Sequence, residues 1–228
     1  MAGVKFWRLL LLKINENFMK FILLLCFAIT YFSSQSAFAS KESLIKFFNE
    51  VTTLQARFDQ VVTDEVGTTL ARSSGDFYLQ RPGKFRWDYL SDDPDISQGQ
   101  QIYSDGKKIT FFDPDLETAT QRSLGDALEQ VPTLALVQSG ESIDEFFTII
   151  DYGITDDLSW VGLKPKDENT AYKSLLLGFD SNKLRSIVLN DGLGNETRLT
   201  LADIKINKRI KRTVFNFSPA AGVDVISE

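Results

Sequence analysis

Histidine is absent from the whole sequence, and cysteine occurs once, at Cys26. Without histidine the chain cannot form a Ser-His-Asp triad, a Cys-His pair or a histidine-ligated metal site. A Gly-x-x-x-x-Gly-Lys phosphate loop is also missing, which argues against a nucleotide site. These absences remove the commonest catalytic and cofactor arrangements, so we predict no catalytic residue, no metal and no cofactor.

Acidic residues are plentiful, but their spacing does not define a site. The clusters Asp92-Asp93-Pro94-Asp95 and Asp113-Pro114-Asp115 lack the alternating ligands, central glycine and terminal glutamate of a calcium loop. We interpret both as solvated turns. A carboxylate pair for glycoside hydrolysis stays open among 31 acidic residues, although nothing in the sequence selects a pair.

Residues 19–39 have the three parts of a cleaved export signal. Lys20 is the charged start, an apolar run extends from Phe21 to Phe32, and Ala37-Phe38-Ala39 is the cleavage site. The run is shorter than the roughly 20 residues that span a bilayer, so an uncleaved anchor is the less favoured alternative. We expect residues 1–39 to be an N-terminal extension and signal, with translation starting at Met19. Cys26 lies inside the signal, which excludes a disulfide scaffold and a catalytic thiol.

The expected mature chain, residues 40–228, is a single acidic domain. It holds 21 basic and 30 acidic residues, a net charge of −9, and an acidic protein is a poor candidate for binding nucleic acid. One basic cluster stands out, at a predicted hairpin tip: Lys205, Lys208, Arg209, Lys211 and Arg212. We interpret it as solvated surface charge, with a docking patch for an acidic partner or a membrane face as the alternative.

Apolar residues recur at intervals of three and four between Ser40 and Val51, which predicts an amphipathic helix. Alternation with a period of two begins at Leu54 and is typical of a half-buried strand. Helical spacing returns between Leu124 and Val131 and again between Ser142 and Phe147. Later strand-like segments are 158–163, 175–179, 184–189, 197–206 and 213–217. About ten short strands joined by hairpin turns predict one strongly curved antiparallel sheet or open barrel, with the helices on one side.

A hairpin with an aromatic inner face is predicted between Gly75 and Tyr89, where Phe85, Trp87 and Tyr89 alternate with charged residues. This segment, GDFYLQRPGKFRWDY, closely resembles the first hairpin of the outer-membrane lipoprotein carrier family, LolA. Shorter similarities follow in the same order, at Ser104–Lys107, Phe111–Pro114, Leu163–Lys166, Phe215–Pro219 and Gly222–Val225. The resemblance covers nearly all of residues 40–226. It departs at Glu117–Thr120, where members of the family usually carry a glutamine before the threonine.

The resemblance implies a mainly β fold, an incomplete, half-open antiparallel β-barrel of about ten to eleven strands with short α-helices as a lid. It also implies a monomeric periplasmic chaperone, and not an enzyme, that binds the acyl chains of lipoproteins. The implied partners are an ATP-driven release complex in the inner membrane and an acceptor lipoprotein on the outer membrane. From the residues alone, two other functions stay open: a lipid-binding sensor or regulator of similar fold, and a histidine-free hydrolase.

The candidate lipid-binding residues are large apolar side chains on the inner faces of the strands and on the predicted lid. They are Phe47, Phe58, Phe77, Phe85, Trp87, Tyr89, Phe111, Leu134, Leu136 and Phe146. The same pattern is equally typical of an ordinary core. Arg81, at the hairpin bend, is assigned as a lid latch because its guanidinium can donate several hydrogen bonds to backbone carbonyls of the lid. The alternative is a surface arginine that fixes its own turn.

Overall fold

The computed structural model describes residues 36–91, 99–125, 143–168, 170 and 172–227, with side chains from residue 41 onwards. The chain divides into two units, Met1–Phe38 and Ala39–Glu228, and all the strands belong to the second. The predicted export signal lies outside the described residues except at its last few positions. The predicted helix at 124–131 also lies mostly outside them.

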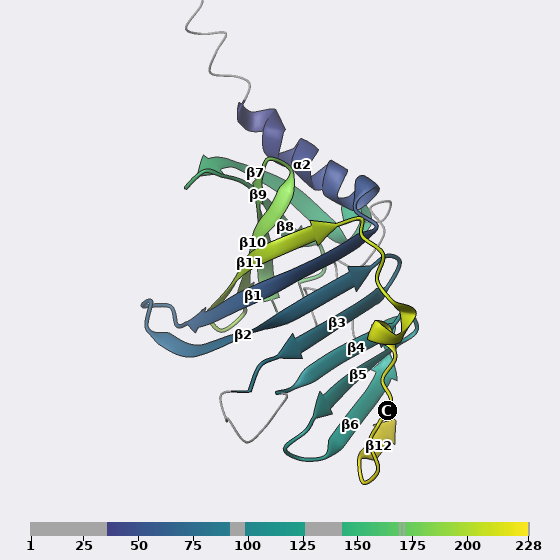
Figure 1. Cartoon of the computed structure of the whole chain (residues 1–228). Helices are drawn as coiled ribbons and strands as arrows, with labels where there is room; N and C mark the ends of the chain where they lie inside the picture. The colour runs from purple at the N-terminus through teal and green to yellow at the C-terminus, as the bar shows by residue number, and fades with distance from the viewer. Residues whose placement is uncertain (1–35, 92–98, 126–142, 169, 171, 228) are drawn as a thin grey trace, which may run out of the picture. The chain divides into compact units, whose positions relative to one another are not determined.

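Twelve strands form one sheet in the order β12-β6-β5-β4-β3-β2-β1-β11-β10-β9-β8-β7 (Figure 1). Their bounds are β1 Thr53–Thr63, β2 Thr69–Gln80, β3 Lys84–Tyr89, β4 Gln101–Asp105, β5 Lys108–Asp113, β6 Thr118–Ser123, β7 Phe147–Thr155, β8 Leu158–Pro165, β9 Tyr172–Asp180, β10 Lys183–Asp191, β11 Glu196–Ile206 and β12 Asp224–Ser227. Within the described residues the edge strands β7 and β12 do not pair with each other, so the sheet is open. The predicted half-open sheet is confirmed.

The sheet departs from the prediction in one pairing and three strands. Strand β12 runs parallel to β6, whereas the sequence pattern predicted antiparallel pairing throughout. Strands β6, β7 and β12 were not among the predicted strands, because their burial patterns do not follow a regular alternation. Bulges interrupt the register of β1 against β11 and of β7 against β8, and such bulges increase the local bend and twist of a sheet.

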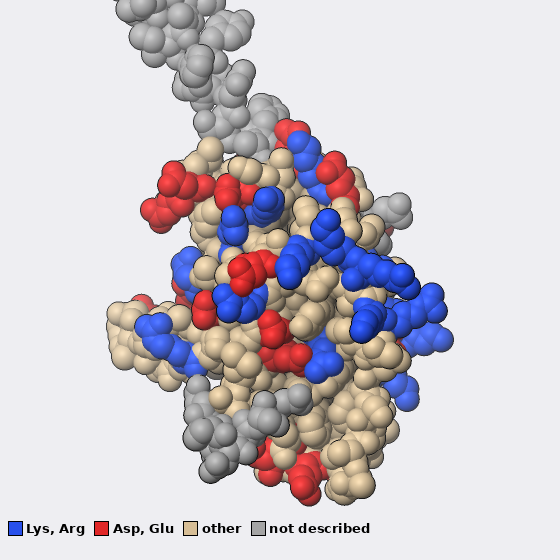
Figure 2. Space-filling view, viewed as in Figure 1, with Lys and Arg blue, Asp and Glu red and all other residues tan. Residues whose placement is uncertain are grey.

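The prediction of a strand at 213–217 is wrong, because Arg212–Phe215 forms a 3₁₀-helix, η3. The backbone of η3 does not join the sheet, and Phe217, just after η3, packs against residues of β4 and β5. The Phe217 ring lies 5.3 Å from the Tyr103 ring and 5.4 Å from the Phe112 ring. The segment before η3 is therefore a connection from β11 and not the predicted hairpin tip. All five basic residues of the cluster are exposed: Lys205 at the end of β11, Lys208, Arg209 and Lys211 in the connection, and Arg212 at the start of η3. Figure 2 shows Lys and Arg side chains gathered on the face in view.

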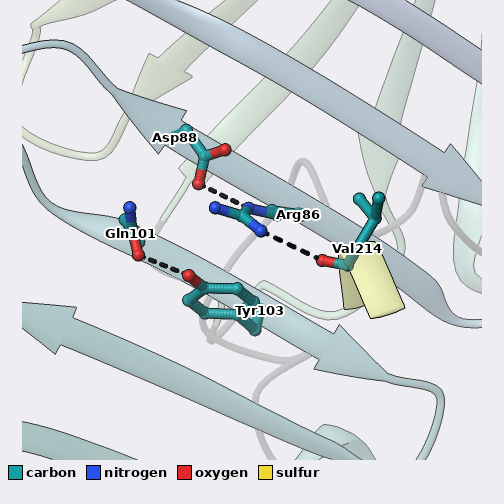
Figure 3. A network of polar contacts seen from close by, with 5 residues as sticks. All are labelled: Arg86, Asp88, Gln101, Tyr103 and Val214. Carbon is teal, nitrogen blue, oxygen red and sulfur yellow. Dashed lines mark hydrogen bonds and ion pairs between the residues drawn. The ribbon is translucent and has the colours of Figure 1, made fainter. Parts of the chain in front are cut away.

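A polar network holds η3 to the sheet (Figure 3). The Arg86 side chain donates to Asp88 Oδ1 at 2.7 Å and to the Val214 carbonyl oxygen at 3.4 Å. Its guanidinium also lies 4.8 Å from the centre of the Tyr103 ring, and the Tyr103 hydroxyl donates to Gln101 Oε1. Burial raises the pKa of Asp88, although the ion pair with Arg86 opposes the rise. These contacts fix the C-terminal segment across β3 and β4.

The helices described in this structure are α2 (Ser36–Glu50), the short α4 (Ile143–Phe146) and η3. Helix α2 includes the amphipathic segment predicted from residue 40, and its apolar residues Leu44, Phe47, Phe48 and Val51, the last just beyond its end, are all buried. Helix α4 lies within the predicted helical turn at 142–147. No helix within the described residues is long and apolar enough to span a bilayer.

Candidate functional site

The pairing register gathers six of the ten candidate cavity residues onto one face of the sheet, here called the aromatic face. Directly paired residues on neighbouring strands point to the same side. Three cross-strand rows define this face, namely Leu54-Leu79-Phe85, Ala56-Phe77-Trp87-Ile102-Phe111 and Phe58-Gly75-Tyr89. The sequence predicted the inner side of each strand correctly, and the register decides which of these side chains become neighbours.

Trp87 lies at the centre of the aromatic face. Its ring centre is 4.7 Å from that of Phe77 and 5.3 Å from that of Phe58, and it stacks on Tyr89 at 6.5 Å. Edge-to-face and tilted pairs of this kind add stabilisation beyond burial alone, about 0.5 to 1.5 kcal/mol per pair. Burial also raises the pKa of Tyr89 to about 12, which keeps its hydroxyl protonated.

Glycine at position 75 is required by the backbone of β3 and by the ring of Phe58. A Cβ atom built at Gly75 would lie 1.9 Å from the Asp88 carbonyl oxygen and 2.8 Å from Phe58 Cε1. Any larger residue would have to displace the β3 backbone or the ring. The glycine that opens the predicted hairpin therefore lets the β3 backbone and the Phe58 ring approach closely, and the sequence pattern did not show this role.

Helix α2 bridges two distant parts of the sheet. Near its middle, Ser43 Oγ donates to Asn182 Oδ1 at 2.8 Å, in the turn between β9 and β10. The Phe47 ring lies 5.9 Å from the Phe179 ring of β9. The C-terminal end of α2 meets the β2–β3 turn, where Arg81 is located. Helix α2 therefore contacts both the β9–β10 hairpin and the β2–β3 turn, and its role as a lid stays a prediction.

Arg81 makes the contacts expected of the proposed latch. Its Nη1 donates to the Val51 carbonyl oxygen and, at 3.4 Å, to the Phe47 carbonyl oxygen. The guanidinium carbon lies 4.7 Å and 4.9 Å from the centres of the Phe47 and Phe48 rings. The last carbonyls of a helix have no intrahelical partner, and Arg81 supplies one. Burial lowers the pKa of Arg81 to about 10, so the side chain stays charged at neutral pH.

Asn207 forms a second clamp on the same end of α2, and sequence reasoning missed it. Its Nδ2 donates to the Glu50 carbonyl oxygen at 2.8 Å, and its Oδ1 accepts from the Thr52 backbone N–H at 2.9 Å. Its own backbone N–H donates to the Thr53 carbonyl oxygen at 2.8 Å. Asn207 has a positive φ of 55°, which asparagine tolerates better than most residues. Because Glu50 lies 157 positions away in the sequence, no local pattern could have indicated this role.

Among the other candidates, Phe146 does not join the aromatic face. Phe146 is 60% exposed at the end of α4, whereas its neighbour Phe147 is buried. Leu134 and Leu136 lie outside the described residues. Phe47 contributes from α2 and is buried in the same core cluster as the sheet residues. Of the eight candidates whose side chains the structure describes, seven come together, six on the sheet and one on α2.

Most side chains of the aromatic face are buried in this structure. Phe58, Phe77, Phe85 and Trp87 are each at most 7% exposed. Two surface hollows of about 590 and 320 Å³ are lined mainly by polar residues and lie elsewhere, one beside Asp203 and Lys205 and the other beside η3. An apolar ligand that reaches the aromatic face must therefore displace part of its covering, of which α2 is one described element.

Comparison with known proteins gives the same picture over most of the chain. The sequence profile of the family described as "Outer membrane lipoprotein carrier protein LolA" matches residues 49–218. The chain is 40% identical over 206 residues to an "Outer-membrane lipoprotein carrier protein" from Methylococcus capsulatus, which covers 90% of this chain and 94% of the relative. A relative of the same description from Methylobacillus flagellatus is 36% identical and covers 82% and 88%. A solved structure of an uncharacterised conserved protein from Thermus thermophilus shares the fold, with a TM-score of 0.52, 10% identity and coverage of 83% and 99%.

Proposed function

Because the chain belongs to the outer membrane lipoprotein carrier protein family, we propose that it carries lipoproteins across the periplasm with their acyl chains against the aromatic face. It acts as a chaperone and not as an enzyme. Its relatives are described as outer-membrane lipoprotein carrier proteins, which supports lipoproteins as the cargo and the periplasm as the location. The predicted cleaved signal at residues 19–39 supplies the route of export, and the mature domain begins at Ser40.

The observation that carries this proposal is the continuous aromatic face under a helix that bridges the sheet. Each methylene removed from water contributes roughly 0.8 kcal/mol, so the acyl chains of one lipoprotein would cost tens of kcal/mol if exposed. A carrier must offset this cost with apolar surface. Phe58, Phe77, Phe85, Trp87 and Phe111 line one side of such a surface, and Phe47 of α2 is buried in the same core cluster.

Release of the cargo requires that the closed position of α2 over the sheet be only marginally stable. The chain has no phosphate-binding loop, so it cannot drive release with its own nucleotide site. We place the energy source in an ATP-driven release complex in the inner membrane, and the destination in an acceptor lipoprotein on the outer membrane. The Arg81 contacts with α2 support the role of a latch that a bound acyl chain can open.

A dye-displacement experiment tests the proposal on the purified mature protein. An environment-sensitive apolar dye should gain fluorescence on binding, and a synthetic diacylated lipopeptide should displace it, because both need the same apolar surface. The unacylated peptide is the matched control and should displace none. A folded protein that binds neither dye nor lipopeptide would rule out a carrier. Release of acylated protein from inner-membrane vesicles into the soluble fraction then separates a carrier from a lipid sensor.

A further inference from the structure

Trp87 carries an unmet hydrogen-bond donor inside the aromatic face. The side chain is 7% exposed, and its Nε1 is buried without a hydrogen-bond partner among the residues that the structure describes. The neighbouring polar groups of this face are paired, since the Tyr89 hydroxyl donates to Gln60 Oε1 at 3.3 Å and Ser104 Oγ to the Gly83 carbonyl oxygen at 2.7 Å. The other described tryptophan, Trp160, donates from Nε1 to the Thr155 carbonyl oxygen at 3.1 Å.

A buried indole N–H without a partner is unusual and destabilising. Buried tryptophan normally finds an acceptor for this group, and leaving it unmet costs free energy that a phenylalanine at the same position would avoid. Packing against Phe77, Phe58 and Tyr89 requires only an aromatic ring. The N–H itself is therefore unexplained by the fold of the described residues.

The surroundings restrict what the N–H can bind. Three aromatic rings pack around the indole, and an anion brought into such an environment would lose its hydration without a compensating charge. A neutral hydrogen-bond acceptor does not incur this desolvation cost. An acyl chain brings one with it, because its hydrocarbon tail is joined to the rest of the molecule through a carbonyl group, either an ester or an amide.

We propose that the Trp87 indole N–H donates a hydrogen bond to an acyl carbonyl oxygen of the bound cargo, in the ester or amide group at the head of an acyl chain. This inference rests on the proposed function and names a polar contact within the same site. The hydrophobic effect is non-directional, so the hydrocarbon alone does not fix how deep a chain lies. One hydrogen bond to its carbonyl sets that depth.

The test replaces Trp87 with β-(3-benzothienyl)alanine, in which sulfur takes the place of the N–H and the ring shape is kept. Dissociation constants are measured for three synthetic lipopeptides that share one peptide. The first carries two ester-linked chains on its glyceryl group, the second carries the same chains through ether bonds, and the third adds an amide-linked acyl chain to the ether form. Trp87→Phe is a second variant that lacks the donor and uses a natural residue.

The expected result is that the effect of removing the N–H depends on whether the lipopeptide carries an acyl carbonyl. Loss of the N–H should weaken binding of one carbonyl-bearing lipopeptide by about two- to tenfold more than binding of the ether form, the range for one neutral hydrogen bond. Coupling to the first lipopeptide identifies an ester carbonyl, and coupling to the third an amide carbonyl. The same replacement at Trp160, whose N–H is already paired, should leave all ratios unchanged.

Two failures are distinguishable. If all three lipopeptides bind and both Trp87 variants weaken them equally, Trp87 is only an apolar contact and the inference is overturned while the carrier function stands. If no lipopeptide binds to the folded wild-type protein, the proposed function itself fails, and this inference fails with it.

Discussion

Replacing Arg81 with leucine removes a charged donor from the C-terminal end of α2 while it keeps an apolar side chain near the rings of Phe47 and Phe48. Pro82 and the alternation of the hairpin are unchanged, so the sheet should fold. The carbonyls of Val51 and Phe47 lose the Nη1 donor that they share. The closed position of the lid helix should therefore become less populated.

The size of the effect follows from the geometry of these bonds. Both start from one nitrogen, and the bond to Phe47 is long at 3.4 Å, so they are counted as a single bond from a charged donor. Such a bond contributes about 1.5 to 3 kcal/mol, which corresponds to about a ten- to hundredfold change in the lid equilibrium. Because burial lowers the pKa of Arg81 only to about 10, this contribution should not change between pH 6 and 8.

A weaker latch should alter delivery more than loading. Part of the free energy of the latch opposes binding of the acyl chains. Without the latch the acyl chains should bind more tightly, and a shift of about 1.4 kcal/mol changes the bound-to-free ratio tenfold. The variant should accept lipoprotein from inner-membrane vesicles, then transfer it poorly to outer membranes that bear the acceptor. Soluble complexes of carrier and cargo should accumulate.

A two-step assay measures release from vesicles and then incorporation into outer membranes. Arg185→Leu is a matched control, because Arg185 makes a surface ion pair with Asp180 at 3.3 Å and surface pairs contribute little. Normal incorporation by folded Arg81→Leu protein would refute the latch. Failure at the first step would instead assign Arg81 to the surface that docks with the release complex.

Four further substitutions, at three positions, test the site. Trp87→Ala should change the free energy of lipopeptide binding more than it changes the free energy of unfolding. A large loss of stability with unchanged binding would show that Trp87 is an ordinary core residue. Asn207→Gly, which keeps the positive φ but loses the side-chain bonds to α2, should lower stability by about 1 kcal/mol and speed amide exchange at the end of α2. Asn207→Asp should act similarly, since a carboxylate cannot donate to the Glu50 carbonyl; unchanged exchange in both variants would contradict the clamp. Gly75→Ala should cost about 1 to 3 kcal/mol in a denaturant titration, and an unchanged midpoint would show that neither the β3 backbone nor the Phe58 ring requires glycine at this position.

Much of the aromatic face could be predicted from the sequence, because side chains alternate across a strand with a period of two. Phe85, Trp87 and Tyr89 must share one side of β3 wherever that strand is placed, and the charged residues between them must share the other. The helix before residue 51 was predictable for a similar reason, since its apolar residues follow the helical period. These are local rules, and they hold without knowledge of the partner strands.

Other features depend on contacts between residues far apart in the chain, and only the tertiary structure decides them. The alternation at 213–217 is typical of a strand, yet Arg212–Phe215 forms η3 and Phe217, just after it, packs on Tyr103 and Phe112. The parallel pairing of β12 with β6 depends on the path of the connection between them. Asn207 acquires a role only because the end of β11 meets the end of α2, and a single asparagine gives no periodic signal of such a meeting.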